Sequence, residues 1–225
     1  MYMKFIVVLI CQIISCLYCY SQQRILFIGN SLSYSNDLPG LVADIGNLSK
    51  QKLEVKCICF PNYGLEDHLK AGTAKTEILE GNYDFVLFQQ GPSSQNDGRV
   101  SLIQYGDSLA TWVKTADAKP YYLMIWTSLS RANTWPSVIV NYKDAAIENK
   151  AGLIAVGAAW KNYLDFHEDA ELYAPDGFHP SLLGSQFAAI YIYQQLFETP
   201  DFHGLSRHWK LSKVHVDKVQ AIIKD

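Results

Sequence analysis

Two short motifs carry the residues whose types and spacing could perform nucleophilic catalysis. Near the start of the chain, GNSLS places the Ser31 hydroxyl just beyond a glycine that permits a sharp turn. Near the other end, DGFHP places Asp176 three residues before His179, so the carboxylate can orient one imidazole nitrogen while the other faces a nucleophile. Each motif alone is also typical of an ordinary turn or helix cap. Together they predict a catalytic triad of Ser31, His179 and Asp176.

Other chemistries lack the residues they need. The phosphate-loop pattern GxxxxGK[ST] is absent, and the first turn lacks GxGxxG spacing. No His, Cys and Asp cluster has metal-ligand spacing, so we expect no metal and no other cofactor. The 19 Lys and Arg against 22 Asp and Glu give a formal net charge of -3. Without a basic excess we expect no nucleic-acid partner.

The motifs need a scaffold, and short apolar runs that alternate with helical segments predict a β/α architecture with a parallel sheet in one domain. The expected strands are rich in β-branched or aromatic residues and cover 24–28, 53–60, 84–89, 121–126 and 153–156. Helices are expected over 38–50, 74–80, 100–115, 137–149 and 181–197 and at the C-terminus. Function collects at the carboxyl ends of parallel strands, so we expect both motifs there, with Trp126 and Trp135 lining a substrate cleft.

In this order the two motifs resemble the SGNH, or GDSL-type, hydrolase family of esterases and lipases. The resemblance covers roughly residues 24–197 and implies a three-layer α/β/α sandwich of flavodoxin-like architecture. It also implies that Ser31 is the nucleophile and that its N–H donates to the oxyanion. CFPNYGLEDHL, after the second strand, resembles the second family block. There Gly64 matches the glycine whose N–H is another oxyanion donor.

The third family block is where this sequence departs. The usual G-x-N-D would fall on residues 91–94, which read GPSS, so the asparagine that completes the oxyanion hole is missing. A glutamine amide offers the same N–H donor on a longer stem, which favours Gln89, then Gln90 or Ser93. Asn30 also stands where many members carry Asp. This G-N-S turn resembles that of a bacterial branch of the family, whose members also have a glutamine at the end of the third strand.

The resemblance implies a serine esterase that hydrolyses ester bonds, and for an exported member of this kind O-acetyl groups on carbohydrates are the expected substrate. One alternative is a catalytically impaired carbohydrate-binding protein on the same fold. Another is a flavodoxin-like nucleotide binder, which would carry flavin absorbance. The oligomeric state stays open.

The N-terminal segment predicts export. Lys4 precedes an apolar run over 5–14, which is shorter than a membrane span needs, and residues 1–21 therefore read as a signal peptide cleaved after Ser21. That leaves residues 22–225 as a periplasmic or extracellular hydrolase domain. The alternative is a lipobox that attaches a lipid to Cys16, and only then do we expect a membrane partner. Of the five cysteines, Cys57 and Cys59 remain, and their spacing along a strand predicts no bridge between them.

Overall fold

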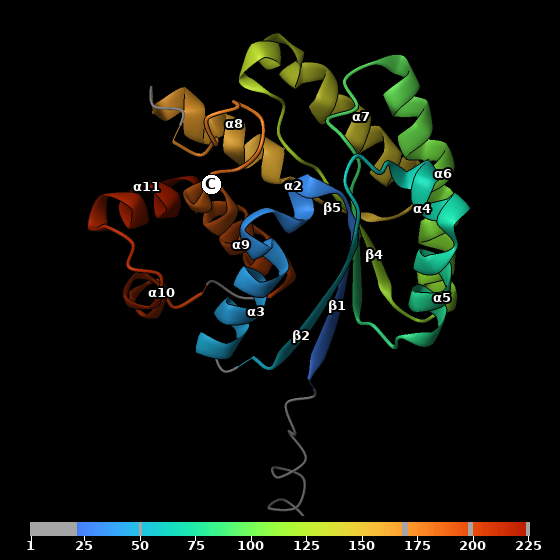
Figure 1. The fold of residues 1–225 in the computed structure, drawn as a ribbon, viewed down its shortest axis with the longest axis horizontal. Coiled ribbons are helices and arrows are strands. Elements are labelled where there is room, and N and C mark those ends of the chain that lie inside the picture. The colour runs from blue at the N-terminus through green and yellow to red at the C-terminus, as the bar shows by residue number, and fades with distance from the viewer. Residues whose placement is uncertain (1–21, 50, 168–170, 198–199, 224–225) are drawn as a thin grey trace, which may run out of the picture.

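The computed structural model describes residues 22–49, 51–167, 171–197 and 200–223, and a five-stranded sheet lies at its centre (Figure 1). Every neighbouring pair is parallel, in the order β2-β1-β3-β4-β5. The strands are β1 Gln23–Gly29, β2 Leu53–Cys59, β3 Phe85–Phe88, β4 Lys119–Leu123 and β5 Gly152–Ile154. The predicted α/β class and parallel sheet are confirmed. The predicted signal segment, residues 1–21 with Cys16, lies outside the described residues.

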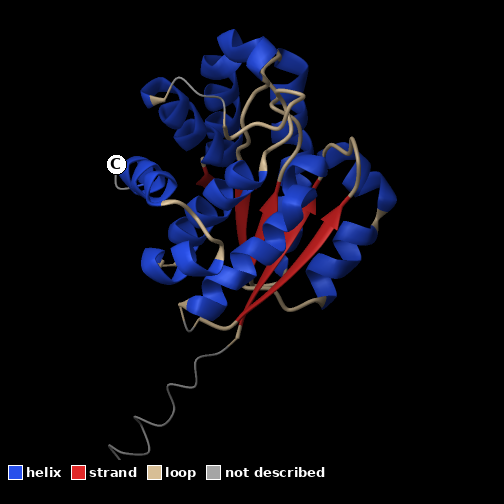
Figure 2. Ribbon diagram, turned by 60° about the vertical axis from the view of Figure 1, so that its left-hand side comes forward, coloured by secondary structure: helices blue, strands red, loops and turns tan. Residues whose placement is uncertain are grey.

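Helices cover both faces of the sheet and complete a three-layer sandwich (Figures 1 and 2). One face carries α3 Leu38–Leu48, α8 Val156–Phe166, α9 Leu182–Leu196, α10 Phe202–His208 and α11 Lys213–Ile223. The other face carries α4 Leu65–Ala71, α5 Thr73–Glu80, α6 Asn96–Thr115 and α7 Trp135–Glu148. Three short pieces complete the chain path: α2 Ser31–Tyr34 and the 3-10 turn η1 Ser35–Asp37 after β1, and the 3-10 turn η2 Leu129–Thr134 before α7.

The strand sequences follow from their places in the sheet. In central β1, residues Ile25 to Ile28 are all fully buried, because Ile25 and Phe27 face one helical layer and Leu26 and Ile28 face the other. Strand β2 pairs only with β1 and lies at an edge, where Glu54 and Lys56 are exposed. This edge position explains why polar and apolar residues alternate over the first half of β2.

The structure differs from the predicted elements in four places, one of which is α10, because its residues were expected to form a loop before the terminal helix. The fourth strand ends at Leu123, and the next three residues continue as a buried loop. Helices α4 and α8 were not predicted. Helix α4 begins after Gly64, where Asp67 supplies the cap from the third position of the helix, and α8 begins after Ala155 with no side-chain cap.

The prediction that the two remaining cysteines stay unbridged is wrong. Cys57 and Cys59 form a disulfide within β2, with their Cα atoms 5.5 Å apart. Residues two apart in a regular strand are separated by about 6.6 Å or more, but a twisted strand has a shorter rise. The local contraction of this edge strand brings the two Cα atoms within the usual range for a disulfide.

Candidate active site

Ser31 lies at the turn where β1 gives way to α2. Asn30 caps this helix, since its Oδ1 accepts a hydrogen bond from the Leu32 N–H at 3.1 Å. The first N–H groups of a helix lack partners inside it, so the Ser31 N–H is available to an oxygen outside the helix. The turn also needs Gly29, because a Cβ there would lie 2.5 Å from the Oε1 atom of Gln89.

His179 and Asp176 reach Ser31 from the loop before α9. The distance from His179 Nε2 to Ser31 Oγ is 3.0 Å, and His179 Nδ1 lies 2.6 Å from Asp176 Oδ2. The hydrogen bond from His179, and next the one from the Phe178 N–H, lower the pKa of Asp176 to about 2. The ionised carboxylate therefore keeps the proton on Nδ1 and leaves Nε2 to accept from the Ser31 hydroxyl. The structure brings together all three residues that the sequence singled out.

A buried tryptophan holds the loop that carries Asp176 and His179. Trp126 Nε1 donates to the Phe178 carbonyl at 2.9 Å, and its ring stacks on Trp160 with centroids 3.8 Å apart. Trp126 is 1% exposed and Trp135 is 4% exposed. The expectation that these two residues line a substrate cleft is therefore wrong, because both side chains fill the core instead.

Two further hydrogen bonds fix the loop at its ends. The Leu129 N–H donates to the Gly177 carbonyl at 2.9 Å, and Asn36 Nδ2 donates to the Pro180 carbonyl at 3.0 Å. Gly177 has a φ of +68°, a left-handed conformation that favours glycine. The loop is thus tied both to the turn after β4 and to the segment that follows Ser31.

Comparison with known proteins supports the assignment of the fold. No protein-family model and no curated protein matches the chain. Among solved structures, a proposed SGNH hydrolase from Slackia heliotrinireducens is 24% identical, with a TM-score of 0.69, and the match covers 79% of this chain and 100% of that one. The chain has the SGNH hydrolase fold.

Two other solved structures extend this likeness at lower identity. A DUF4886 family protein from Bacteroides uniformis is 16% identical, with a TM-score of 0.76 and coverage of 90% of this chain and 93% of that one. The acetylxylan esterase Axe2 from Geobacillus stearothermophilus, solved as a catalytic mutant, is 15% identical with a TM-score of 0.56. That match covers 82% of this chain and 93% of the esterase.

Within this SGNH fold, Gly64 lies beside Ser31 but its N–H already has a partner. Both residues line a cavity of about 280 Å³. The Gly64 N–H donates to Asp67 Oδ2 at 2.8 Å, in the capping interaction that starts α4. A backbone donor is therefore in the predicted place, and an oxyanion would share it with a carboxylate.

Gln89, the preferred third oxyanion donor, faces away from this cavity. It is fully buried, and its Oε1 accepts from the Asn30 N–H at 3.1 Å and from Ser33 Oγ at 2.8 Å. Its Nε2 donates to Asn30 Oδ1 at 3.2 Å and to the Gln90 carbonyl. The expectation for Gln89 does not fit this geometry, because the side chain braces the turn that carries Ser31.

The two alternatives for the third donor also have partners inside the protein. Gln90 Nε2 donates to Ser93 Oγ at 2.8 Å and to the Gly98 carbonyl at 3.2 Å, and Ser93 Oγ donates to the Gly91 carbonyl. Strand parity explains the difference between the glutamines. Gln89 continues the alternate positions of β3 that face α3 and α9, whereas Gln90 faces α4 and α6.

A buried histidine supports the same turn and was not singled out by the sequence. His68 Nε2 lies 2.9 Å from the Gly29 carbonyl, to which it donates. The side chain is 1% exposed, and burial lowers its pKa. Its position on α4, whose helical character was not predicted, hid this contact from sequence reasoning.

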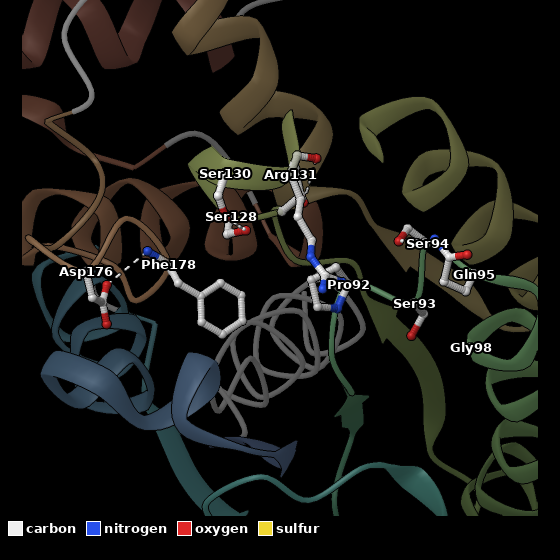
Figure 3. Close-up of a pocket in the computed structure, with 11 residues that line it drawn as sticks. Pro92, Ser93, Ser94, Gln95, Gly98, Ser128, Ser130, Arg131, Asp176 and Phe178 are labelled. Carbon is white, nitrogen blue, oxygen red and sulfur yellow. Dashed lines mark hydrogen bonds between the residues drawn. The ribbon is translucent and has the colours of Figure 1, made fainter. Parts of the chain in front are cut away.

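A second cavity adjoins the first around Phe178, which lines both. It has a volume of about 540 Å³ and is bordered by the loop after β3, the turn η2 and the Asp176 loop (Figure 3). The side chains that face it are mostly polar. The described residues contain no group of three His, Cys, Asp or Glu that could hold a metal ion. Over the same part of the chain, no helix has the length and apolar character to cross a bilayer.

Proposed function

We propose that this chain is a serine esterase that works through an acyl-enzyme intermediate. The observation that carries the proposal is the continuous hydrogen-bonded path from Ser31 Oγ through His179 to Asp176. A serine hydroxyl is a weak nucleophile by itself and needs such a base, oriented by a third group. The hydrolases and esterases among the structural neighbours support this activity.

The reaction follows from the positions of these groups. Ser31 Oγ attacks the ester carbonyl carbon while His179 Nε2 takes the hydroxyl proton, and Asp176 stabilises the resulting imidazolium. The tetrahedral oxyanion accepts hydrogen bonds from the N–H groups of Ser31 and Gly64. His179 then gives its proton to the departing alcohol oxygen, which leaves Ser31 acylated. A water molecule, deprotonated by His179, releases the carboxylic acid and restores the serine.

We propose O-acetyl groups on carbohydrates as the substrate. The 280 Å³ cavity beside Ser31 is small and suits a short acyl group. Serine and glutamine side chains border the adjoining cavity, as a sugar hydroxyl requires. An acetylxylan esterase among the structural neighbours supports the same substrate class.

Export of the protein is part of the proposal. The N-terminal segment reads as a signal peptide, with lipid attachment at Cys16 as the alternative. The disulfide between Cys57 and Cys59 supports an oxidising compartment such as the periplasm or the extracellular space.

The test is hydrolysis of 4-nitrophenyl acetate by the wild type, Ser31→Ala and Ser137→Ala. Loss of the nucleophile should lower kcat by roughly 10,000-fold or more. Ser137 is an exposed serine at the start of α7, and its variant should retain wild-type kcat. Equal rates for the wild type and Ser31→Ala would refute the mechanism.

A noncatalytic carbohydrate-binding protein is the second candidate. It is favoured by one observation: the Gly64 N–H is held by Asp67, and the amides of Gln89 and Gln90 are engaged inside the protein. An impaired oxyanion hole would leave the wild type without measurable hydrolysis, while binding of an oligosaccharide would persist. Hydrolysis that depends on Ser31 excludes this candidate.

A further inference from the structure

The larger cavity contains a cation that the proposed chemistry does not use. Arg131, in η2, lines this 540 Å³ space together with Asp176 and Phe178. Figure 3 shows its side chain pointing into the cavity, toward the loop that carries Pro92. Phe178 lines both this cavity and the one beside Ser31, and the consecutive residues Gly91 and Pro92 line one each, so the second space is next to a ligand bound at Ser31.

The Arg131 guanidinium has no acidic partner among the described residues. By contrast, Arg24 pairs with Glu54 at 2.6 Å and Arg99 pairs with Asp144 at 3.0 Å. A guanidinium offers a planar set of donors that matches a carboxylate. The N–H groups of the Arg131 guanidinium face the cavity and, within the described part of the chain, do not pair with a neighbouring carboxylate.

The backbone around Arg131 is well fixed. Its N–H donates to the Ser128 carbonyl at 3.0 Å, and its carbonyl accepts from Thr134 Oγ1 at 2.8 Å and Thr127 Oγ1 at 3.3 Å. The base of the side chain is therefore held in place before any ligand arrives, which reduces the entropy lost on binding.

The opposite wall of the cavity is equally well held. Asn141 Nδ2 donates to the Ser93 carbonyl at 2.7 Å, and the Tyr142 hydroxyl donates to the Gly91 carbonyl at 3.0 Å. These contacts fix a loop in which Ser93 takes a positive φ of 57°. The cavity is thus a preorganised space between two braced segments.

The charges around the cavity indicate a monoanion. Asp176 is the one acidic residue among those lining it, and its carboxylate is committed to His179 and to two backbone N–H groups. Arg131 supplies a single positive charge. A carboxylate matches the single charge and planar donors of Arg131, whereas a dianionic phosphate would feel about twice the repulsion from Asp176. Hydroxyl groups of Ser94, Ser128 and Ser130 at the same cavity suit a polyhydroxylated ligand.

The proton path decides which half of the ester enters this cavity. His179 must deliver a proton to the departing alcohol oxygen, so the alcohol half lies on the side of the Asp176–His179 loop. That loop is a wall of the larger cavity. We propose that Arg131 determines specificity for esters whose alcohol half carries a carboxylate, as in uronic acids. This inference rests on the proposed esterase function.

The experiment compares two substrates of nearly the same shape, an O-acetylated methyl glucuronoside and its uncharged carboxamide. The kcat/KM for acetate release is measured for the wild type, Arg131→Gln, Arg131→Lys and Arg207→Gln. The wild type should prefer the acid by about tenfold, the value expected for hydrogen bonds to one charged group. Arg131→Gln should bring the ratio close to one, and Arg131→Lys should restore part of it.

Arg207→Gln is the matched control, because it removes an exposed arginine from α10, which packs against α3 and does not line the cavity. It should retain the wild-type ratio. An acid-to-amide ratio near one in the wild type, or an unchanged ratio in Arg131→Gln, would overturn the proposal.

A binding measurement separates this proposal from the esterase proposal. Methyl glucuronoside, which has no ester, is titrated into Ser31→Ala and into Ser31→Ala with Arg131→Gln. The second substitution should weaken binding by about tenfold. If no variant hydrolyses either ester but this difference is found, the esterase function fails and the carboxylate site stands. Equal affinities of the two proteins would refute the carboxylate site whatever the activity.

Discussion

At the scale of single residues, the turn that carries Ser31 depends on the buried side-chain amides of Gln89 and Asn30. Gln89 accepts from the Asn30 N–H and from Ser33 Oγ, and Asn30 in turn caps the helix that begins with Ser31. A short chain of buried hydrogen bonds thus connects the end of β3 to the turn after β1. Gln89 therefore supports the turn that carries the serine.

Replacing Gln89 with Met tests this supporting role. The substitution leaves two buried donors, Asn30 N–H and Ser33 Oγ–H, without their acceptor, which should lower the free energy of unfolding by about 3 kcal/mol. Urea unfolding of the variant measures the loss, and exposed Gln104→Met on α6 should change stability by less than about 0.5 kcal/mol. An oxyanion donor would behave differently: unchanged stability with a reduced kcat would contradict the interpretation.

Asp176 should show its role in the pH dependence of stability. Its pKa is lowered from 3.8 to about 2 in the folded protein, chiefly by the hydrogen bond from His179. A lowered pKa stabilises the folded state above the unfolded value, and this contribution is lost as the pH falls through the folded value. The stability difference between the wild type and Asp176→Asn should therefore shrink between pH 4 and pH 2. A difference in urea unfolding that stays constant over this range would count against the ionised pair.

Asp176→Asn should also lower kcat by roughly 10,000-fold at neutral pH, because the amide no longer holds the proton on His179 Nδ1. The same carboxylate would then account for both the stability profile and the activity.

At the scale of elements, the edge strand β2 combines two functions. It completes the sheet beside β1, and its carboxyl end leads to the segment that places Gly64 next to Ser31. The disulfide lies at this end of the strand. Because the cross-link closes a loop of only a few residues, it removes little entropy from the unfolded chain.

Reduction of the disulfide should therefore destabilise the protein only modestly. We expect the free energy of unfolding to fall by about 1 to 2 kcal/mol, from the short loop that the bridge closes. Urea unfolding with and without a phosphine reductant measures this loss, and a Cys57→Ala, Cys59→Ala variant should no longer respond to the reductant. A wild type with two titratable thiols before reduction would refute the bridge.

At the scale of the whole molecule, the sequence predicts the elements that have a regular apolar pattern and the motifs at their ends. It does not predict the direction of single side chains such as Gln89 and Trp126. The parallel sheet follows from apolar runs such as residues 25–28, and the Ser31, Asp176 and His179 motifs follow from the turns at the ends of its elements. The direction of the Gln89 amide depends on which helical layer its strand position faces, which requires the strand order. The position of Trp126 after the fourth strand predicts a place in the cleft, but its indole N–H finds a partner in the Phe178 carbonyl and the ring is buried.

Experiment can also decide at which residue the mature protein begins. A short apolar run after Lys4 and small residues before Gln22 favour cleavage after Ser21, so the exported protein should have the mass of residues 22–225. Intact-mass measurement of the protein recovered from the exporting host gives the answer. Cys16→Ala should leave that mass and the release of the protein unchanged. A mature chain that begins at a lipid-modified Cys16 would show instead that the domain is tethered to a membrane surface.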